Sequence, residues 1–493
     1  IILVYYKEVI QDKDKINLIN WNIVSINPKE KNWNWIDLFC VWANSTQSII
    51  GFSLIASLYI LYDISFLLVL CSSLFAAFLV CFFAHLISKP SQKYGLPFPV
   101  ILRISTGIIG AKYISLFRGI VGIFMFGVQT YFISKSIGYL IRIFIYKIEP
   151  SLLEQELFLY FFMGLNSIDL FSLVLTLIIQ YTFFSAGAKI NRTFIKFSAF
   201  FVYFGLIFFS FIIISENYSA LKETLKEIIV IENIFIKENI NPFLTITGTM
   251  FAYLSIMILS FGDFSRYVKN NSEIIKGNLS LLINLLLFSF FAIIIVLGSQ
   301  IIFSNNNIQI ERILTNPADI IGKIDNAYIT VVVLFFILFA SLSTNLIANY
   351  IPSQNVLLNF LPSKLNLKGS GLIIIFFALL VGIFWEAILS KIGILSIVDT
   401  FASFFGPIFG IMVVDYYITK KGTIINKDVF SSATESSYYY SSGWHIKAIY
   451  SILIGFIFAA STIWNTNLMF LQSYSWIIGA FFAAFVYYLL AIE

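Results

Sequence analysis

Apolar stretches long enough to cross a lipid bilayer recur along the whole chain, and no other feature constrains its fold as strongly. A membrane-spanning helix needs about 20 mostly apolar residues. With 59% hydrophobic and 12% charged residues, the chain has more apolar surface than a water-soluble domain can bury. The pattern predicts an all-α polytopic membrane protein with twelve spans, at residues 36–61, 64–88, 112–146, 155–185, 193–215, 242–266, 277–303, 324–350, 370–388, 391–418, 445–463 and 469–491.

Basic residues collect in the short loops that follow the even-numbered spans. Such residues favour cytoplasmic loops, so we predict two cytoplasmic termini, with residues 1–35 as a cytoplasmic N-terminal segment, in a plasma or bacterial inner membrane. We expect Arg103 and Arg266 to mark this topology and to contact lipid head groups. The loop residues are Lys89, Lys93, Arg103, Lys189, Arg192, Lys196, Arg266, Lys269, Lys276, Lys364, Lys368, Lys420, Lys421 and Lys427.

Histidine and cysteine form no cluster in the sequence. His85 and His445 stand far apart, and Cys40, Cys71 and Cys81 lie within apolar stretches. A zinc site, or a membrane-embedded acyl or glycosyl transferase, needs clustered ligands or catalytic groups. We therefore expect neither an enzyme nor a resident cofactor. The net charge of +5 reflects loop topology rather than a nucleic-acid partner.

Polar residues interrupt four spans at mid-membrane depth, where unpaired polar groups are costly. Serine and threonine often bond only to their own helix, but the amides of Gln129 and Asn349 each have four hydrogen-bonding positions to satisfy. A break at the polar run of span 1 would offer backbone carbonyls to a cation. The interruptions are Asn44, Ser45, Thr46, Gln47 and Ser48 in span 1, Gly127 and Gln129 in span 3, Thr245, Thr247, Gly248, Thr249, Tyr253 and Ser255 in span 6, and Ser341, Ser343, Thr344, Asn345 and Asn349 in span 8.

Spans 1 and 6 lie five apart and both are interrupted. Interrupted spans at corresponding places in two halves of a chain indicate a transporter with inverted repeats and a binding site at the membrane midplane. We therefore predict one repeat over residues 36–215 and a second over 242–418, with two further helices over 445–491.

The same stretches resemble the nucleobase–cation symporter-1 family, whose motifs occur here in family order. The resemblance implies twelve helices, a five-plus-five inverted-repeat sodium-symporter fold with helices 1 and 6 broken, and cation-coupled uptake of purines, pyrimidines, hydantoins, allantoin or related heterocycles. The matching motifs are Trp33-Asn34-Trp35, Trp42, Ala56-Ser57-Leu58, Tyr94 to Val100, Arg103, Gly107, Gly110-Ala111, Arg118, Phe126 to Thr130, Asp263 to Tyr267, Ser343-Thr344-Asn345, Asn349, Gly406-Pro407, Gly410 to Met412, Asp415-Tyr416-Tyr417 and Gly443-Trp444.

The resemblance also implies a sodium site between spans 1 and 8. Its ligands would be the carbonyls of Asn44, Gln47 and Ala340 and the hydroxyls of Ser343 and Thr344. Neutral oxygens are sufficient for a single positive charge. The two hydroxyls favour sodium as the coupling ion and leave proton coupling open.

On the substrate side, the resemblance assigns Gln129 and Asn349 to the edge of a planar ring, with Ser48 nearby. Two tryptophans normally sandwich that ring, but their positions hold Met125 and Leu254. Methionine stacks weakly and leucine not at all. Either Phe124, Phe126 or Tyr253 takes over by a helical shift, or the substrate is non-aromatic, more flexible or bulkier.

The sequence thus favours a sodium-coupled symporter of a nucleobase-like heterocycle, working as a monomer in the bilayer. The loss of both tryptophans motivates an alternative, a proton-coupled carrier of a vitamin-like or amino-acid-like solute on the same fold. A membrane enzyme and a non-transporting nutrient sensor are the remote alternatives.

Overall fold

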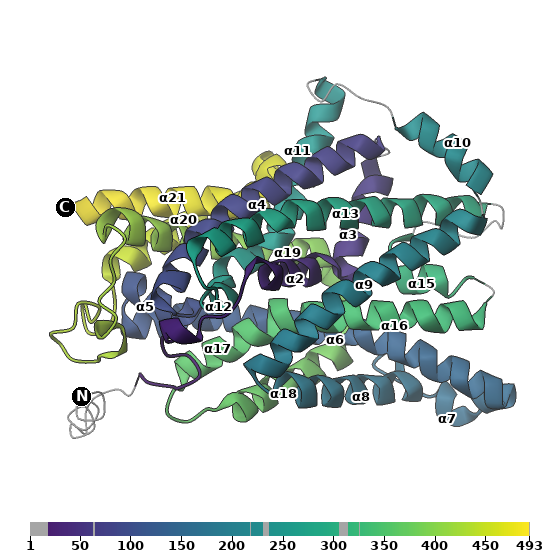
Figure 1. Ribbon diagram of the computed structural model, residues 1–493, viewed down its shortest axis with the longest axis horizontal. Helices are drawn as coiled ribbons and strands as arrows, with labels where there is room; N and C mark the ends of the chain where they lie inside the picture. Colours follow the sequence, from purple (N-terminus) through teal and green to yellow (C-terminus); the bar gives the residue numbers. More distant parts are fainter. Residues whose placement is uncertain are drawn as a thin grey trace.

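The computed structural model describes residues 18–62, 65–216, 218–229, 236–304, 314–324 and 326–492, and almost all of them are helical. The long helices run along the longest axis of the molecule (Figure 1). The elements before residue 230 are η1 (Pro28–Glu30), α2 (Trp35–Thr46), α3 (Ile49–Tyr62), α4 (Phe66–Tyr94), α5 (Phe98–Thr106), α6 (Ile108–Ile148), η2 (Pro150–Glu154), α7 (Glu156–Leu159), β1 (Phe161–Phe162), β2 (Leu165–Asn166), α8 (Ser167–Phe184), α9 (Ala188–Glu216) and α10 (Tyr218–Ile228).

The second half of the chain is built in the same way, with two short π-helical turns. Its elements are α11 (Lys237–Ser260), α12 (Gly262–Ser265), α13 (Asn271–Ser304), α15 (Pro317–Ile321), α16 (Ala327–Thr344), the π-helix η3 (Asn345–Tyr350), α17 (Ile351–Phe360), α18 (Leu367–Trp385), η4 (Leu389–Ile392), α19 (Ile394–Val414), the π-helix η5 (Asp415–Thr419), η6 (Asp428–Phe430), α20 (Ile446–Trp464), η7 (Thr466–Tyr474) and α21 (Ser475–Ile492).

Eleven helices of the described chain are long and apolar enough to cross a bilayer, and the bent pair α2–α3 makes a twelfth span. The predicted all-α membrane architecture is therefore confirmed. The predicted start of span 4 at residue 155 is wrong, because α8 begins only at Ser167. An antiparallel hairpin precedes it, with Gly164 at a φ of +81° in its turn. Glycine has no Cβ to clash in this conformation, so the chain turns here before the helix starts.

The spans divide into two packed groups. In one group α4 packs against α11 and α13, and α13 also packs against α2. In the other, α6 packs against α8, α17 and α18. Helix α9 contacts α2 on one side and α16 on the other. Helix α2 also contacts α16 and the π-helix η3, so the polar residues of spans 1 and 8 meet where the two groups face each other.

The chain before α2 lies across one end of the helices. Asn20 Nδ2 donates to Pro362 O at 2.9 Å, and Ile26 N donates to Gly95 O at 3.0 Å. The C-terminal end of α21 lies at the same end of the molecule, on the left of Figure 1. Residues 1–17 lie outside the described part of the chain, and the cytoplasmic placement of both termini stays a prediction.

The expectation that Arg103 and Arg266 reach lipid head groups is wrong. Arg103 is fully buried, and its guanidinium donates to Asn359 Oδ1 at 2.6 and 3.0 Å and to Val429 O at 3.1 Å. Arg266 is also buried and donates to Asn22 O at 3.1 Å. Both side chains bond backbone carbonyls of neighbouring segments inside the protein, so neither guanidinium reaches the membrane surface.

The expected interruption within span 6 also differs from the structure. Helix α11 runs without a break through the polar stretch from Thr245 to Ser255 and ends at Ser260. Phe261 separates α11 from the short α12 that follows. Ser255 Oγ donates to Ala252 O at 2.7 Å. A hydroxyl satisfied by its own helix does not require a break.

Candidate functional site

The break in span 1 falls between α2 and α3, which meet at an angle of 59°. Helix α2 ends at Thr46, and Gln47 leaves the helical conformation with φ −79° and ψ +64°. Ser48 Oγ then accepts the Gly51 N–H at 2.8 Å. A serine side chain that accepts from the third residue of a helix is a good N-cap. Ser48 therefore starts a new helix and stabilises the break locally.

Oxygen atoms from spans 1 and 8 meet at this break. Thr344 Oγ1 lies 2.5 Å from Asn44 O, 3.5 Å from Gln47 O and 2.9 Å from Ala340 O. Ser343 Oγ donates to the same Ala340 carbonyl at 3.0 Å. The structure thus brings together all five residues that the resemblance assigns to a sodium site.

The balance of donors and acceptors at this cluster suits a cation. The Thr344 hydroxyl has one hydrogen, yet three carbonyl oxygens lie within 3.5 Å of its oxygen. Ser343 supplies one further hydrogen. All five residues are buried, with exposed fractions no greater than 9%. These buried acceptors outnumber the hydroxyl hydrogens that face them, and a small cation would satisfy the remaining lone pairs.

A second polar cluster joins spans 3, 4 and 8 through their amides. Asn349 Nδ2 donates to Gln129 Oε1 at 3.2 Å and to Asn345 Oδ1 at 2.8 Å. Asn345 Nδ2 donates to Thr130 Oγ1 at 3.2 Å, and Thr130 donates to Gln180 Oε1 at 2.9 Å. The predicted pair of Gln129 and Asn349 is brought together. Asn345, Thr130 and Gln180 extend the cluster and hold the two amides in orientation.

The amide cluster adjoins the carbonyl cluster along span 8. Gln129 Nε2 donates to Ser341 O at 3.4 Å, one residue beyond Ala340. Among the described residues this bond uses one of the two Gln129 amide hydrogens. A ring carbonyl could accept the other.

A π-helical turn places Asn349 in this cluster. The turn η3 covers Asn345–Tyr350, and Pro352 follows in α17. Proline lacks the N–H that would bond the carbonyl four residues earlier, here that of Ala348. Arg118 takes its place, because its Nη2 donates to Ala348 O at 2.8 Å. Turns of this type inside α-helices often occur at functional sites.

Ser48 and Tyr253, both predicted to contact substrate, contact each other. Their hydroxyl oxygens are 2.7 Å apart, and Tyr253 Oη also lies 3.3 Å from Ser45 O. Met125 and Leu254 are buried, with 6% and 1% of their surfaces exposed. Met125 precedes Gln129 by one helical turn and so shares its face of α6. The stacking positions are thus filled by aliphatic side chains within the core.

Four residues of this site were not predicted as site residues from the sequence, although three of them lie in the matching motifs. Arg118 is fully buried in α6, and its Nε donates to Ser260 Oγ of α11 at 2.9 Å. A charged residue in a predicted span is itself a signal of function, and this one marked the position. Asn345 stood in a polar run, but nothing local distinguished its amide from its neighbours. Thr130 and Gln180 gained importance only through tertiary contact.

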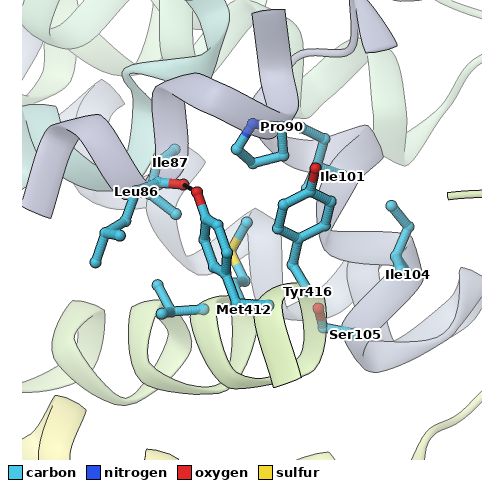
Figure 2. A pocket seen from close by; sticks show the side chains of 10 residues that line it. Leu86, Ile87, Pro90, Ile101, Ile104, Ser105, Met412 and Tyr416 are labelled. Atoms are coloured by element: carbon cyan, nitrogen blue, oxygen red, sulfur yellow. Dashed lines mark hydrogen bonds between the residues drawn. The ribbon is translucent and has the colours of Figure 1, made fainter. Parts of the chain in front are cut away.

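One hollow borders the carbonyl cluster, and a second is lined by none of the residues of the two polar clusters. The larger, of about 460 Å³, is mostly apolar and includes Gln47, Ser48, Phe52, Phe209, Phe288 and Ala340. The other, of about 330 Å³, lies between α4, α5 and α19 and is lined by Ile87, Pro90, Ile101, Met412, Tyr416 and Tyr417 (Figure 2). Neither is lined by Gln129 or Asn349.

Comparison with known proteins gives consistent results. Residues 25–482 match the family described as permease for cytosine/purines, uracil, thiamine and allantoin. The chain is 24% identical to a purine-uracil permease of Arabidopsis thaliana over 90% of this chain and 71% of the relative. It is also 24% identical to an allantoin permease of Bacillus subtilis, over 98% of this chain and 94% of the relative.

Solved transporters share the fold. Mhp1, a nucleobase-cation-symport-1 family transporter solved with bromovinylhydantoin bound, superposes with a TM-score of 0.72 at 16% identity, covering 96% of this chain and 95% of Mhp1. A Na+-coupled sialic acid symporter gives a TM-score of 0.63 at 12% identity, covering 94% of this chain and 91% of that chain. These likenesses confirm the predicted inverted-repeat symporter fold.

Proposed function

Because the chain belongs to the nucleobase–cation symporter-1 family of permeases, we propose that it couples the entry of a sodium ion to the uptake of a nucleobase-like nitrogen heterocycle. Members of this family are transporters rather than enzymes. The chain is accordingly an integral membrane protein that carries a small heterocyclic solute. The identity of the coupling ion, the residues that bind ion and solute, and the transport cycle are what we propose.

The oxygen cluster at the break of span 1 is the observation that carries the sodium assignment. Unwound carbonyls of a broken span are the groups that coordinate sodium in inverted-repeat transporters. Here the carbonyls of Asn44 and Gln47 face the Thr344 hydroxyl. The partial negative charges of neutral oxygens attract a metal cation. A site made only of such oxygens offers no carboxylate that could carry a proton.

The amide cluster supports a heterocyclic substrate. Amides present both donors and acceptors, so the Gln129–Asn349 pair can bond the alternating N–H and C=O groups of such a ring. Met125 and Leu254 cannot clamp the ring by stacking, and affinity would then depend on the amides and on the hydroxyls of Ser48 and Tyr253.

Transport would proceed by alternating access. We assign residues 36–215 and 242–418 to the two repeats, with both termini cytoplasmic. The group of α2–α3, α4, α11 and α13 would rock against the group of α6, α8, α16–α17 and α18 around the bound ion and solute. Sodium entry supplies about 2.3 kcal/mol per 100 mV of membrane potential, in addition to its concentration gradient.

Uptake into vesicles tests the proposal. Labelled uracil, allantoin and hydantoin should accumulate with an inward sodium gradient and not with choline. Ser343→Ala and Thr344→Ala should raise the sodium concentration for half-maximal uptake about tenfold or more, as expected when about 1.4 kcal/mol of binding energy is lost. Thr462→Ala is the matched control, because its buried hydroxyl bonds only to Ala459 O of its own helix.

Uptake that follows a pH gradient and ignores sodium would overturn the coupling assignment and favour the proton-coupled alternative. Sodium-driven uptake of an amino acid, without competition from any heterocycle, would overturn the substrate class alone.

A further inference from the structure

Tyr253 is the residue of α11 that contacts the break in span 1 through its side-chain hydroxyl. Its Oη lies 2.7 Å from Ser48 Oγ and 3.3 Å from Ser45 O, so it touches one residue on each side of Gln47. Other hydroxyls of α11 bond elsewhere. Thr247 donates to Ser72 O of α4, and Ser255 bonds within α11.

The direction of these hydrogen bonds follows from the donors available. Ser48 Oγ accepts the Gly51 N–H, and its own hydrogen remains free to donate. Tyr253 Oη can donate to Ser45 O, which has no hydrogen to offer. The arrangement that uses every donor runs from Gly51 N–H to Ser48, from Ser48 to Tyr253, and from Tyr253 to the Ser45 carbonyl.

This chain of bonds lies beside the carbonyls of the proposed cation site. Asn44 precedes Ser45 and Gln47 precedes Ser48, and both carbonyls lie within 3.5 Å of Thr344 Oγ1. Bonding Ser45 and Ser48 to one phenol limits how far the two carbonyls can separate. Because the phenol bonds residues on both sides of the break, it keeps the two carbonyls in position. A cation that binds them then loses less of its binding energy to ordering the site.

Resting on the proposed function, we propose that Tyr253 is a positioning residue that couples the substrate site to the sodium site. Tyr253 is half-buried, whereas the residues that flank it, Ala252 and Leu254, are buried. A heterocycle that bonds Ser48 or Tyr253 therefore acts on the hydroxyl chain that sets the separation of the Asn44 and Gln47 carbonyls. Sodium and solute then strengthen each other's binding by the same factor.

Tyr253→Phe tests the proposal, since it removes the hydroxyl and keeps the ring. Thermal stability of the purified full chain is measured against sodium chloride, with choline chloride keeping ionic strength constant. The sodium midpoint should rise about tenfold. In the wild type, saturating allantoin or uracil, whichever stabilises the protein, should lower the sodium midpoint. In Tyr253→Phe this effect of the solute should be largely lost.

Tyr417→Phe is the matched control. Tyr417 is also a tyrosine whose hydroxyl donates between helices to a backbone carbonyl, that of Leu86 at 3.0 Å, and it lines the hollow between α4, α5 and α19. Tyr417→Phe should lose about as much thermal stability as Tyr253→Phe and keep the wild-type sodium midpoint. If Tyr253→Phe does not fold, Ser48→Ala interrupts the same chain from its other end and should shift the midpoint in the same direction.

The outcomes separate the two proposals. A wild-type protein that sodium does not stabilise overturns the proposed function and this inference with it. A wild-type response to sodium that is unchanged in both Tyr253→Phe and Ser48→Ala overturns the inference alone. An equal midpoint shift in Tyr417→Phe also overturns it, because the effect would then report general loosening of the fold.

Discussion

Spans 1 and 6 occupy corresponding places in the two predicted repeats and carry similar polar runs, yet only span 1 breaks in its middle. Helices α2 and α3 meet at 59° around Gln47 and Ser48. Helix α11 continues through Thr245 to Ser255. Polar content alone therefore does not decide whether a membrane helix unwinds.

The difference lies in what the side chains can bond. Ser48 caps the next helix through the Gly51 N–H, and Thr344 of span 8 reaches the carbonyls before it. In span 6 the hydroxyl of Ser255 returns to its own helix, and Thr247 reaches the neighbouring α4. A break is stable where caps and partners replace the helical bonds that are lost.

The largest effect is expected from adding a methyl group at the break. A Cβ on Gly51 would lie 2.6 Å from Thr46 O, a backbone atom next to the cation carbonyls. Gly51→Ala should weaken sodium binding by about 3 kcal/mol, which raises the sodium midpoint about a hundredfold. Gly248→Ala in span 6 would approach the Ser473 side chain at 2.6 Å instead, and should reduce thermal stability without moving the sodium midpoint. Equal midpoints for the two variants would show that the break is not the ion site.

A smaller effect is expected at the start of span 1, where Asp37 is buried against Arg192 at 2.6 Å and Lys196 at 3.0 Å. Asp37→Asn should destabilise the protein by about 2 kcal/mol. This loss is smaller than that expected for a fully buried ion pair, because both basic partners remain partly hydrated. Glu273→Gln changes a half-buried carboxylate that accepts from Trp35 N at the same helix start, and should cost under about 0.5 kcal/mol. Thermal unfolding in detergent compares them, and equal losses would contradict the role of the buried pair.

The smallest effect is expected from removing one serine hydroxyl in each of the two spans. Ser48→Ala removes the cap of α3 and should weaken sodium binding by about 1 kcal/mol, or about fivefold. Ser255→Ala removes a hydroxyl that bonds only within α11 and should change sodium binding by less than about 0.3 kcal/mol. Sodium titrations of both variants decide the point. A larger shift for Ser255→Ala would place the functional break in span 6.

Much of the candidate site could be predicted because its residues repeat a family pattern. All five predicted cation residues meet, as do Gln129 with Asn349 and Ser48 with Tyr253. Residues whose importance lies in distant partners could not be predicted. Arg118 bonds a carbonyl that Pro352 leaves free, and that partnership spans 230 positions in the chain. The buried positions of Arg103 and Arg266 could not be predicted for the same reason, because the acceptors that hold them lie far away in the sequence.

The apolar spans and their basic loops were determined by the sequence by itself, because a bilayer accepts only long apolar helices and charges remain outside it. The order of the motifs also determined the family. Tertiary structure alone decided which polar run unwinds, which hydroxyl bridges the break and which amides meet. Those outcomes depend on hydrogen bonds between residues far apart in the chain, and a polar side chain in a membrane protein has no function until its partner is in place.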